Sequence, residues 1–433
     1  MVAWNSDADV AIIAGARTPW AKAGTALKDV HVTDLASAAM QETLYRAEVR
    51  GDDVDEVILG NVVMPPDAGN PARVAAIWAA IPEEKPAMTV QRNCASGIEA
   101  VAEAAGRIRA GQAKCVLAGG AESMSTIPLL FPQESMAPFA RLSRAKNAWQ
   151  KAAAAAALRP RHFAPRSALE SGLTDPTCDM IMGKTAELLA SEFGIGRAEQ
   201  DEFALRSHRL AAAAQQAGKP GVEIAPLYVG DGSEPVTEDN GVRANQTSEA
   251  LAKLKPIFDR RDGTVTVGNS CQITDGAAAM VVMEGERARA EGREVMGYVR
   301  GYAYVGLDPA RMGLGPVFAI DQLLREAGMG LSDIGLFEIN EAFAAQVLAC
   351  LKAMSSSRFA CEHLNRKDAI GEIDLEKLNV NGGSIALGHP VGATGTRLVL
   401  TLLAEMKRRD VEWGVAALCV GGGQGAAMLL QRR

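Results

Sequence analysis

Three segments in the first part of the chain recur, in the same order, near its end. Each set begins with a strand that ends in Asn and continues with small residues that lead into a long helix. A strand that ends in glycines completes it. The matching pairs are 56–65 with 335–344, 93–111 with 388–410, and 115–124 with 417–428. Recurrence in a fixed order indicates a duplicated structural unit.

Each copy of this unit alternates apolar runs with helix-period segments. Residues 9–16 (DVAIIAGA), 56–63 (EVILGNVV) and 115–123 (CVLAGGAES) predict buried strands. Helices with one apolar face are predicted at 32–47 and 96–112. The pattern predicts an α/β fold of two halves, with central mixed sheets covered by helices. Because glycine is abundant (43 residues) and aromatic residues are few (5%), we expect close approach between backbones.

The 433 residues are too many for one simple core. We expect an N-terminal half over 1–120 and 249–288, and a C-terminal half over 289–433. Residues 121–248, rich in Pro, Met and a run of Ala, predict an inserted loop domain. Strand character resumes at 263–283, and the polar segment 355–379 is expected on the surface.

Charge and hydropathy exclude several classes of partner. The net charge of −7 comes without a basic block, which argues against nucleic acid. The start lacks the features of a secretory leader, and no run approaches 18 clean apolar residues, so no membrane span is expected. The sequence thus predicts a soluble, cytoplasmic protein.

Cys94 is the cysteine whose position most suggests chemistry. The seven cysteines are widely spaced and include no CxxC pair, so free thiols are expected rather than disulfides or a zinc site. Most free cysteines are small buried hydrophobes. Cys94, however, precedes a predicted helix start, where the unpaired N–H groups and the helix dipole favour a thiolate.

Three further residues could act with Cys94. His389 lies in a glycine-dense loop, Cys419 precedes three glycines, and Asn340 ends a strand. A neutral imidazole can take a thiol proton, and glycine N–H groups can stabilise an oxyanion. The alternatives remain a structural His and, for Asn340, a helix N-cap. Together these residues predict acyl transfer through a thioester, with no metal. A second thiol would act as acid/base, which a thiol can do near pH 7 if its pKa is lowered.

The motifs NCASG, INEAFAAQ, NVNGGSIALGHPVGATGTR and CVGGGQGAAM resemble those of the thiolase family. RTPWAKAGTAL, MGKTAELLA and GNSCQITDGAAA resemble it too, so the similarity runs from about residue 10 to 430. The resemblance implies a duplicated thiolase fold with a loop domain inserted in the first half. It also implies a homodimer or homotetramer.

The resemblance implies that Cys94 takes the acyl group, His389 activates it and Cys419 moves a proton on the acetyl methyl group. One oxyanion site falls on His389 with a water held by Asn340, and another on the N–H groups of Cys94 and Gly421. Coenzyme A (CoA) and acyl-CoA thioesters are then substrates, with no permanently bound cofactor. The residues implied at the substrate and CoA site are Met182, Arg243, Ser270, Cys271 and Phe343.

Two positions bear on the subclass within the family. Ile181 stands where acetoacetyl-CoA thiolases usually have His, and Gln272 also resembles the degradative class. We therefore expect a 3-ketoacyl-CoA thiolase of fatty-acid β-oxidation, with an acetoacetyl-CoA thiolase as the alternative. Cys271 departs from the Ser of many members. Cys419 argues against a decarboxylating ketoacyl synthase. The presence of Cys94, His389 and Cys419 together argues against an inactive scaffold subunit. A partner protein in a β-oxidation complex stays open.

Overall fold

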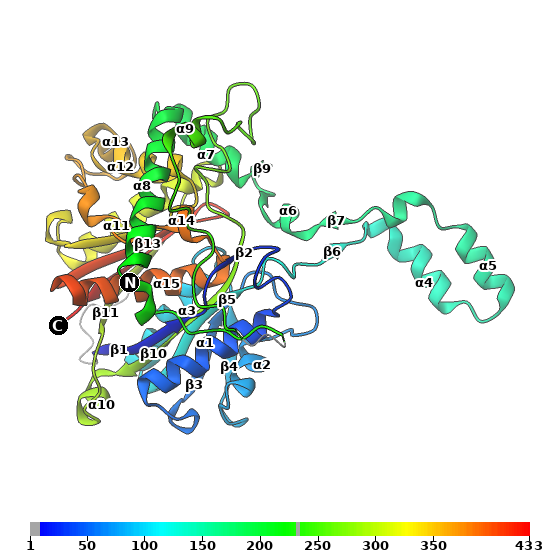
Figure 1. Cartoon of the computed structure of the whole chain (residues 1–433), viewed down its shortest axis with the longest axis horizontal. Coiled ribbons are helices and arrows are strands. Elements are labelled where there is room, and N and C mark those ends of the chain that lie inside the picture. Colours follow the sequence, from blue (N-terminus) through cyan, green and yellow to red (C-terminus); the bar gives the residue numbers. More distant parts are fainter. Residues whose placement is uncertain (1–8, 231–233) are drawn as a thin grey trace.

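The computed structural model describes residues 9–230 and 234–433, and its centre is one large mixed sheet (Figure 1). The strands of this sheet are β1 Val10–Arg17, β2 Ala21–Lys22, β3 Glu56–Gly60, β4 Ala87–Val90, β5 Cys115–Glu122, β10 Thr274–Glu284, β11 Gly297–Gly306, β12 Leu336–Ile339, β13 Trp413–Val420 and β14 Gln424–Gln431. Nine of them follow the order β12-β13-β14-β11-β1-β10-β5-β3-β4, and β2 pairs with β10. The predicted strands over residues 9–16, 56–63 and 115–123 correspond to β1, β3 and β5.

The strand pairing confirms the duplication. In the first half β3 runs parallel to β5, and β5, β10 and β1 are antiparallel neighbours. In the second half β12, β13, β14 and β11 repeat these relations in the same order. The two sheets expected from the sequence are joined into one, because β1 and β11 pair at Ala11–Tyr298 and Ile12–Gly297.

Helices cover both faces of this sheet. The helices of the two halves are α1 Val32–Ala47, α2 Pro71–Trp78, α3 Ser96–Arg109, α10 Gly285–Ala290, α11 Gly315–Ala327, α12 Ala344–Met354, α13 Ser357–His363, α14 Ser384–Leu387 and α15 Val391–Arg409. Of these, α13 packs mainly on α12, and α14 packs mainly on the helix at 197–216. The prediction of a helix at 32–47 matches α1 residue for residue, and the second predicted helix ends at Arg109. α3 and α15 pack together in the middle, against strands of both halves (Figure 1). α1 and α2 cover the outer face of the first half, and α11 and α12 that of the second.

Alternating side chains of the strands supply these layers. Along β5, Val116 and Ala118 join the apolar cluster around α3 and α15, whereas Cys115 and Leu117 join the cluster around α1. This is the two-residue period of a strand with both faces buried. The glycine-bounded apolar runs of the sequence therefore fold as central strands.

The region between β5 and β10 departs from the sheet. Its elements are β6 Leu129–Leu130, α4 Met136–Arg144, α5 Ala148–Ala156, β7 Arg166–Ser167, α6 Ala168–Gly172, β8 Thr174–Asp175, β9 Met180–Ile181, α7 Met182–Glu192, α8 Arg197–Gln216 and α9 Ser248–Ala252. β6 and β7 pair at the base of an arm whose far end carries α4 and α5 (Figure 1). The division into domains predicted from the sequence remains a prediction.

Strand character was predicted from residue 263, but β10 begins only at Thr274. The residues before it turn because their side chains bind the local backbone. Asn269 Oδ1 accepts from Thr266 N at 2.7 Å, and Ser270 Oγ donates to Thr266 O at 2.7 Å. Such bonds compete with a strand ladder.

Glycines let α3 and α15 cross at backbone contact. A Cβ on Gly97 would lie 2.6 Å from Thr396 N, and one on Gly395 would lie 2.4 Å from Ile98 N. The expected close approach of backbones is thus present between the two central helices. It brings the start of α3, preceded by Cys94, next to the start of α15, preceded by His389.

We predict that Gly97→Ala destabilises the protein by about 1–3 kcal/mol, because a methyl group must be forced into this crossing. The matched control is Gly106→Ala on the same helix, where the nearest atom lies 3.7 Å from the new Cβ. That control should be neutral or more stable by about 0.5–1 kcal/mol, since Ala favours a helix interior. Urea unfolding of both variants measures the difference, and equal stability would contradict the packing argument.

Candidate active site

A cavity of about 330 Å³ lies where the starts of α3 and α15 meet the ends of β5 and β13. Cys94, His389, Cys419 and Gly421, which come from both halves of the duplicated unit, line it together. Of the residues expected at the substrate site, Met182, Cys271 and Phe343 line the same cavity. The structure therefore brings together seven of the ten residues singled out from the sequence.

Asn93 connects the two halves beside Cys94, a role that sequence reasoning missed. It has a left-handed backbone conformation, with φ of 43°, which Asn tolerates better than most residues. Its side-chain Nδ2 donates to Gly421 O at 2.8 Å. This bond holds the glycine loop after β13 against the turn that carries Cys94.

The Cys94 thiol is kept protonated in the free protein. Burial raises its pKa above the ordinary value, while the N–H groups of Gly421 and of Cys94 itself oppose that effect. We expected the helix start to favour a thiolate, but the effect of desolvation on the pKa is larger. To act as a nucleophile, the Cys94 thiol would consequently need a base.

His389, which lines the same cavity, is a candidate for that base, and its neighbours define its tautomer. Thr394 Oγ1 donates its one hydrogen to Pro390 O at 2.9 Å, because a carbonyl can only accept. Toward His389 Nδ1, which is 2.6 Å away, Thr394 Oγ1 can then only accept. His389 thus carries its proton on Nδ1 and has its lone pair on Nε2. Burial, with the nearby positive charge of Arg397, lowers the pKa of His389 to about 3, so the ring is neutral near pH 7.

Cys419, the penultimate residue of β13, supplies a second protonated thiol. Burial and the neighbouring Cys94 raise its pKa well above the ordinary value. The sequence argument expected a lowered pKa at this position. A thiol that holds its proton is instead suited to act first as an acid.

Asn340 is fully buried and does not cap a helix. The next helix, α12, begins at Ala344 with Phe343 as its N-cap, which excludes the alternative reading of Asn340. Asn340 Nδ2 lies 3.5 Å from His389 Nε2, the limit of a hydrogen bond. Asn340 does not itself line the cavity and reaches it through His389.

Glu122 is a second residue that sequence reasoning missed. Its carboxylate, buried in the cavity wall, accepts from Val62 N (3.1 Å), Val63 N (3.0 Å) and Gly392 N (3.0 Å). These bonds tie the loop after β3 to the first turn of α15, which follows His389. Burial raises the pKa of Glu122 to about 7, and these N–H donors oppose the rise. The repeat could have revealed it, because Glu122 has the sheet position in the first half that Cys419 has in the second.

Ser270 and Arg243 are not among the cavity-lining residues. The Ser270 hydroxyl donates to Thr266 O, and the Arg243 main-chain N–H donates to His208 Nδ1 at 3.2 Å. Their roles in CoA binding therefore stay predictions. Over residues 9–230 and 234–433, no group of three or more His, Cys, Asp or Glu is arranged to hold a metal ion, and no helix is long and apolar enough to cross a membrane.

Family models identify the class of protein. Residues 10–286 match the N-terminal domain of thiolase, and residues 293–432 match its C-terminal domain. The chain therefore belongs to the thiolase family and is an acyltransferase.

Individual relatives agree with this assignment. The 3-ketoacyl-CoA thiolase of Yersinia enterocolitica is 39% identical over 423 residues, which cover 98% of this chain and 96% of that protein. Among solved structures, the acetyl-CoA acetyltransferase of Bacillus anthracis has a TM-score of 0.87 and 38% identity, over 99% of this chain and 100% of that one. Human mitochondrial 3-ketoacyl-CoA thiolase in complex with CoA has a TM-score of 0.85 and 35% identity, over 98% of both chains.

The raised pKa of Cys94 predicts how the free protein reacts with iodoacetamide. Because only the thiolate reacts, alkylation at Cys94 should accelerate continuously from pH 6 through pH 9. No step should appear near pH 6.5, since His389 stays neutral there. Peptide mass spectrometry resolves Cys94 from the other cysteines, and Cys94→Ser gives the background. A rate at Cys94 that is constant from pH 6 to 9 would indicate a preformed thiolate–imidazolium pair instead.

Proposed function

We propose that this thiolase cleaves 3-ketoacyl-CoA with CoA, giving acetyl-CoA and a shortened acyl-CoA, in fatty-acid β-oxidation. The observation that carries the proposal is the convergence of Cys94, His389 and Cys419 on one cavity between the two halves. Two thiols and one base match the two tasks of the reaction, which are attack on a carbonyl and protonation of a departing carbon.

In the first half-reaction, Cys94 Sγ attacks the 3-keto carbon while its proton passes to His389 Nε2. Cleavage of the C–C bond leaves an acyl thioester on Cys94 and expels the enolate of acetyl-CoA. Cys419 Sγ–H gives its proton to the departing carbon. In the second half-reaction the thiol of CoA gives its proton to the Cys419 thiolate and attacks the Cys94 thioester. The Cys94–acyl bond breaks, and Cys94 takes back the proton held on His389 Nε2, so that both thiols and the neutral imidazole are restored.

The N–H groups of Cys94 and Gly421 support the charged intermediates. Both interact with the Cys94 sulfur in the free protein. A tetrahedral carbon bonded to that sulfur would place its oxyanion near the same donors. His389, with a water held by Asn340, forms the second oxyanion site, in line with the 3.5 Å approach of Asn340 Nδ2 to His389 Nε2.

The wall of the cavity favours an aliphatic acyl group. Apolar side chains lie around the catalytic residues and come from the loop after β3, the segment after β5, the segment around α6, the start of α7, the turn 309–314 and the residue before α12. They include Val62, Val63, Met124, Leu169, Leu173, Met182, Met312 and Phe343. We assign CoA and acyl-CoA as substrates, with Met182, Cys271 and Phe343 in contact with them. We keep Ser270 and Arg243 as proposed contributors outside this wall.

The likeness to the Bacillus anthracis acetyl-CoA acetyltransferase supports a second candidate, the synthesis of acetoacetyl-CoA from two acetyl-CoA. The arguments for the degradative class are the apolar wall and the apolar Ile181 directly before Met182. The two candidates differ in the acyl length they accept.

We predict that kcat/KM for thiolysis of 3-ketoacyl-CoA substrates rises by at least about tenfold between the four-carbon and the eight-carbon member, because each added methylene buried in the apolar wall gains about 0.8 kcal/mol. Thiolysis is followed at constant CoA concentration. Leu173→Asp should reduce the longer substrate's advantage and leave the four-carbon rate nearly unchanged. Activity confined to the four-carbon substrate would favour the acetoacetyl-CoA candidate.

We also propose a homodimer in the cytoplasm. Within the described part of the chain, β4 lies at the edge of the main sheet and pairs with β3 alone, and the neighbouring α2 exposes Ile77 and Trp78 by 46% and 51%. An edge strand beside exposed apolar side chains is suited to a second copy of the chain. A homotetramer, or a partner from a β-oxidation complex, could build on that dimer.

A further inference from the structure

We propose that Ser384, Arg397 and Glu338 are positioning residues that hold the side-chain amide of Asn340 in the orientation needed by His389. This inference rests on the proposed function, in which His389 and Asn340 form an oxyanion site. The three residues touch no substrate in that scheme and act only through Asn340.

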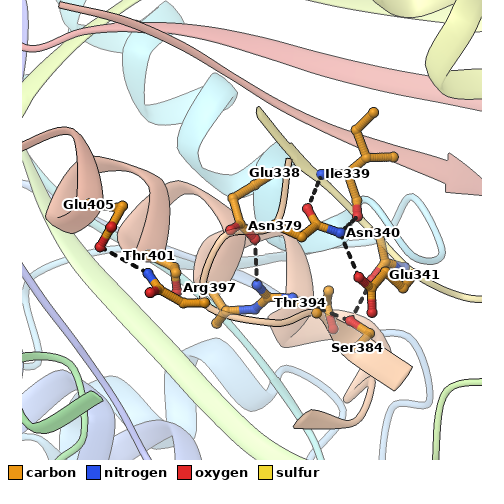
Figure 2. Close-up of polar contacts among 12 residues, drawn as sticks. Glu338, Ile339, Asn340, Glu341, Asn379, Ser384, Thr394, Arg397, Thr401 and Glu405 are labelled. Atoms are coloured by element: carbon orange, nitrogen blue, oxygen red, sulfur yellow. Dashed lines mark hydrogen bonds and ion pairs between the residues drawn. The ribbon is translucent and has the colours of Figure 1, made fainter. Parts of the chain in front are cut away.

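The four residues form one buried chain of contacts (Figure 2). Glu338 lies in β12 and Asn340 directly follows that strand, while Ser384 begins α14 and Arg397 lies in α15. Arg397 Nη1 binds Glu338 Oε2 at 2.8 Å, and Arg397 Nη2 donates to Ser384 Oγ at 3.3 Å. Ser384 Oγ lies 2.6 Å from Asn340 Oδ1.

The hydrogens of this chain can be arranged in only one direction. A guanidinium has donors and no acceptor, so Ser384 Oγ must accept from Arg397. The single hydroxyl hydrogen of Ser384 then goes to Asn340, whose facing atom must be the carbonyl oxygen Oδ1. The NH₂ group of Asn340 is therefore turned toward His389 Nε2. Without Ser384, the amide could turn over and present its oxygen to that nitrogen.

Burial gives the arrangement its strength. The side chains of Arg397 and Glu338 are 1% and 3% exposed, and such a pair seldom stabilises a fold more than apolar residues of similar size. The ion pair instead fixes the orientation of the Arg397 guanidinium. Glu338 binds one end of it, and the other end faces Ser384. The donor of the hydrogen bond from Arg397 to Ser384 is thereby held in place.

The backbone at Asn340 is held by other contacts. Asn340 N donates to Ala417 O at 2.9 Å, and the next residue, Glu341, accepts from Ser207 Oγ at 2.6 Å and Asn379 Nδ2 at 2.8 Å. Loss of the Ser384 hydroxyl should therefore release the amide without displacing the chain. This separation makes the inference testable by kinetics.

The test is a double-mutant cycle of Ser384→Ala and Asn340→Ala, with kcat and KM measured for 3-ketoacyl-CoA thiolysis by the full chain. We expect Ser384→Ala to lower kcat about tenfold with KM nearly unchanged, the size of one lost hydrogen bond. The same change in the Asn340→Ala background should then have no further effect on kcat. Equal losses in both backgrounds would overturn the inference, as would an unchanged kcat in Ser384→Ala.

Ser384→Cys is the second variant, because it keeps the packing and replaces the hydroxyl by a weak donor. It should lower kcat in the same direction, and wild-type kcat in this variant would count against the inference. Thr401→Val is the matched control, since Thr401 is a buried residue of α15, the helix of Arg397, and its hydroxyl donates to Glu223 at 3.0 Å. It should lower the melting temperature and keep kcat. If the wild-type chain cleaves no 3-ketoacyl-CoA, the proposed function fails, whereas an additive cycle in an active enzyme refutes only the positioning role.

Discussion

The contact between α3 and α15 is the constraint on which the site depends. Gly97 and Gly395 leave no room for a side chain, so the two helices touch through their backbones. Each helix belongs to one half of the duplicated chain, and each follows a residue that can do chemistry. The crossing therefore sets Cys94 and His389 in one cavity, and the glycine loop after Cys419 closes it through its bond to Asn93.

Burial gives the site its chemical character. It raises the pKa of Cys94 and Cys419 and lowers that of His389, so the free protein contains two protonated thiols and a neutral imidazole. In the proposed reaction, charge then develops only as bonds form and break, close to N–H groups that are already in place. The hydroxyl of Thr394 determines the tautomer of His389, and the hydroxyl of Ser384 determines the orientation of the Asn340 side-chain amide.

The sequence predicts the duplication, the α/β class and the main catalytic candidates, because periodicity and glycine placement are local signals. It does not predict Glu122 or Asn93 as site residues, since their partners are distant backbone groups on other elements. The sequence also does not predict that the pKa of Cys94 is raised rather than lowered, because desolvation depends on all the groups that pack around the thiol. The strand expected from residue 263 fails for a local reason, as Asn269 and Ser270 bind nearby backbone instead.

The central claim, that Cys94 carries the acyl group, is tested most directly by incubating the protein with isotopically labelled acetyl-CoA and locating the label by peptide mass spectrometry. We predict a thioester on Cys94 in the wild type and in Cys419→Ala, because in the proposed reaction Cys419 acts only on the carbon that departs. Cys94→Ser should carry no label on Cys271 or Cys419, although both share the cavity. A label on either of these thiols in the Cys94→Ser variant would contradict the account.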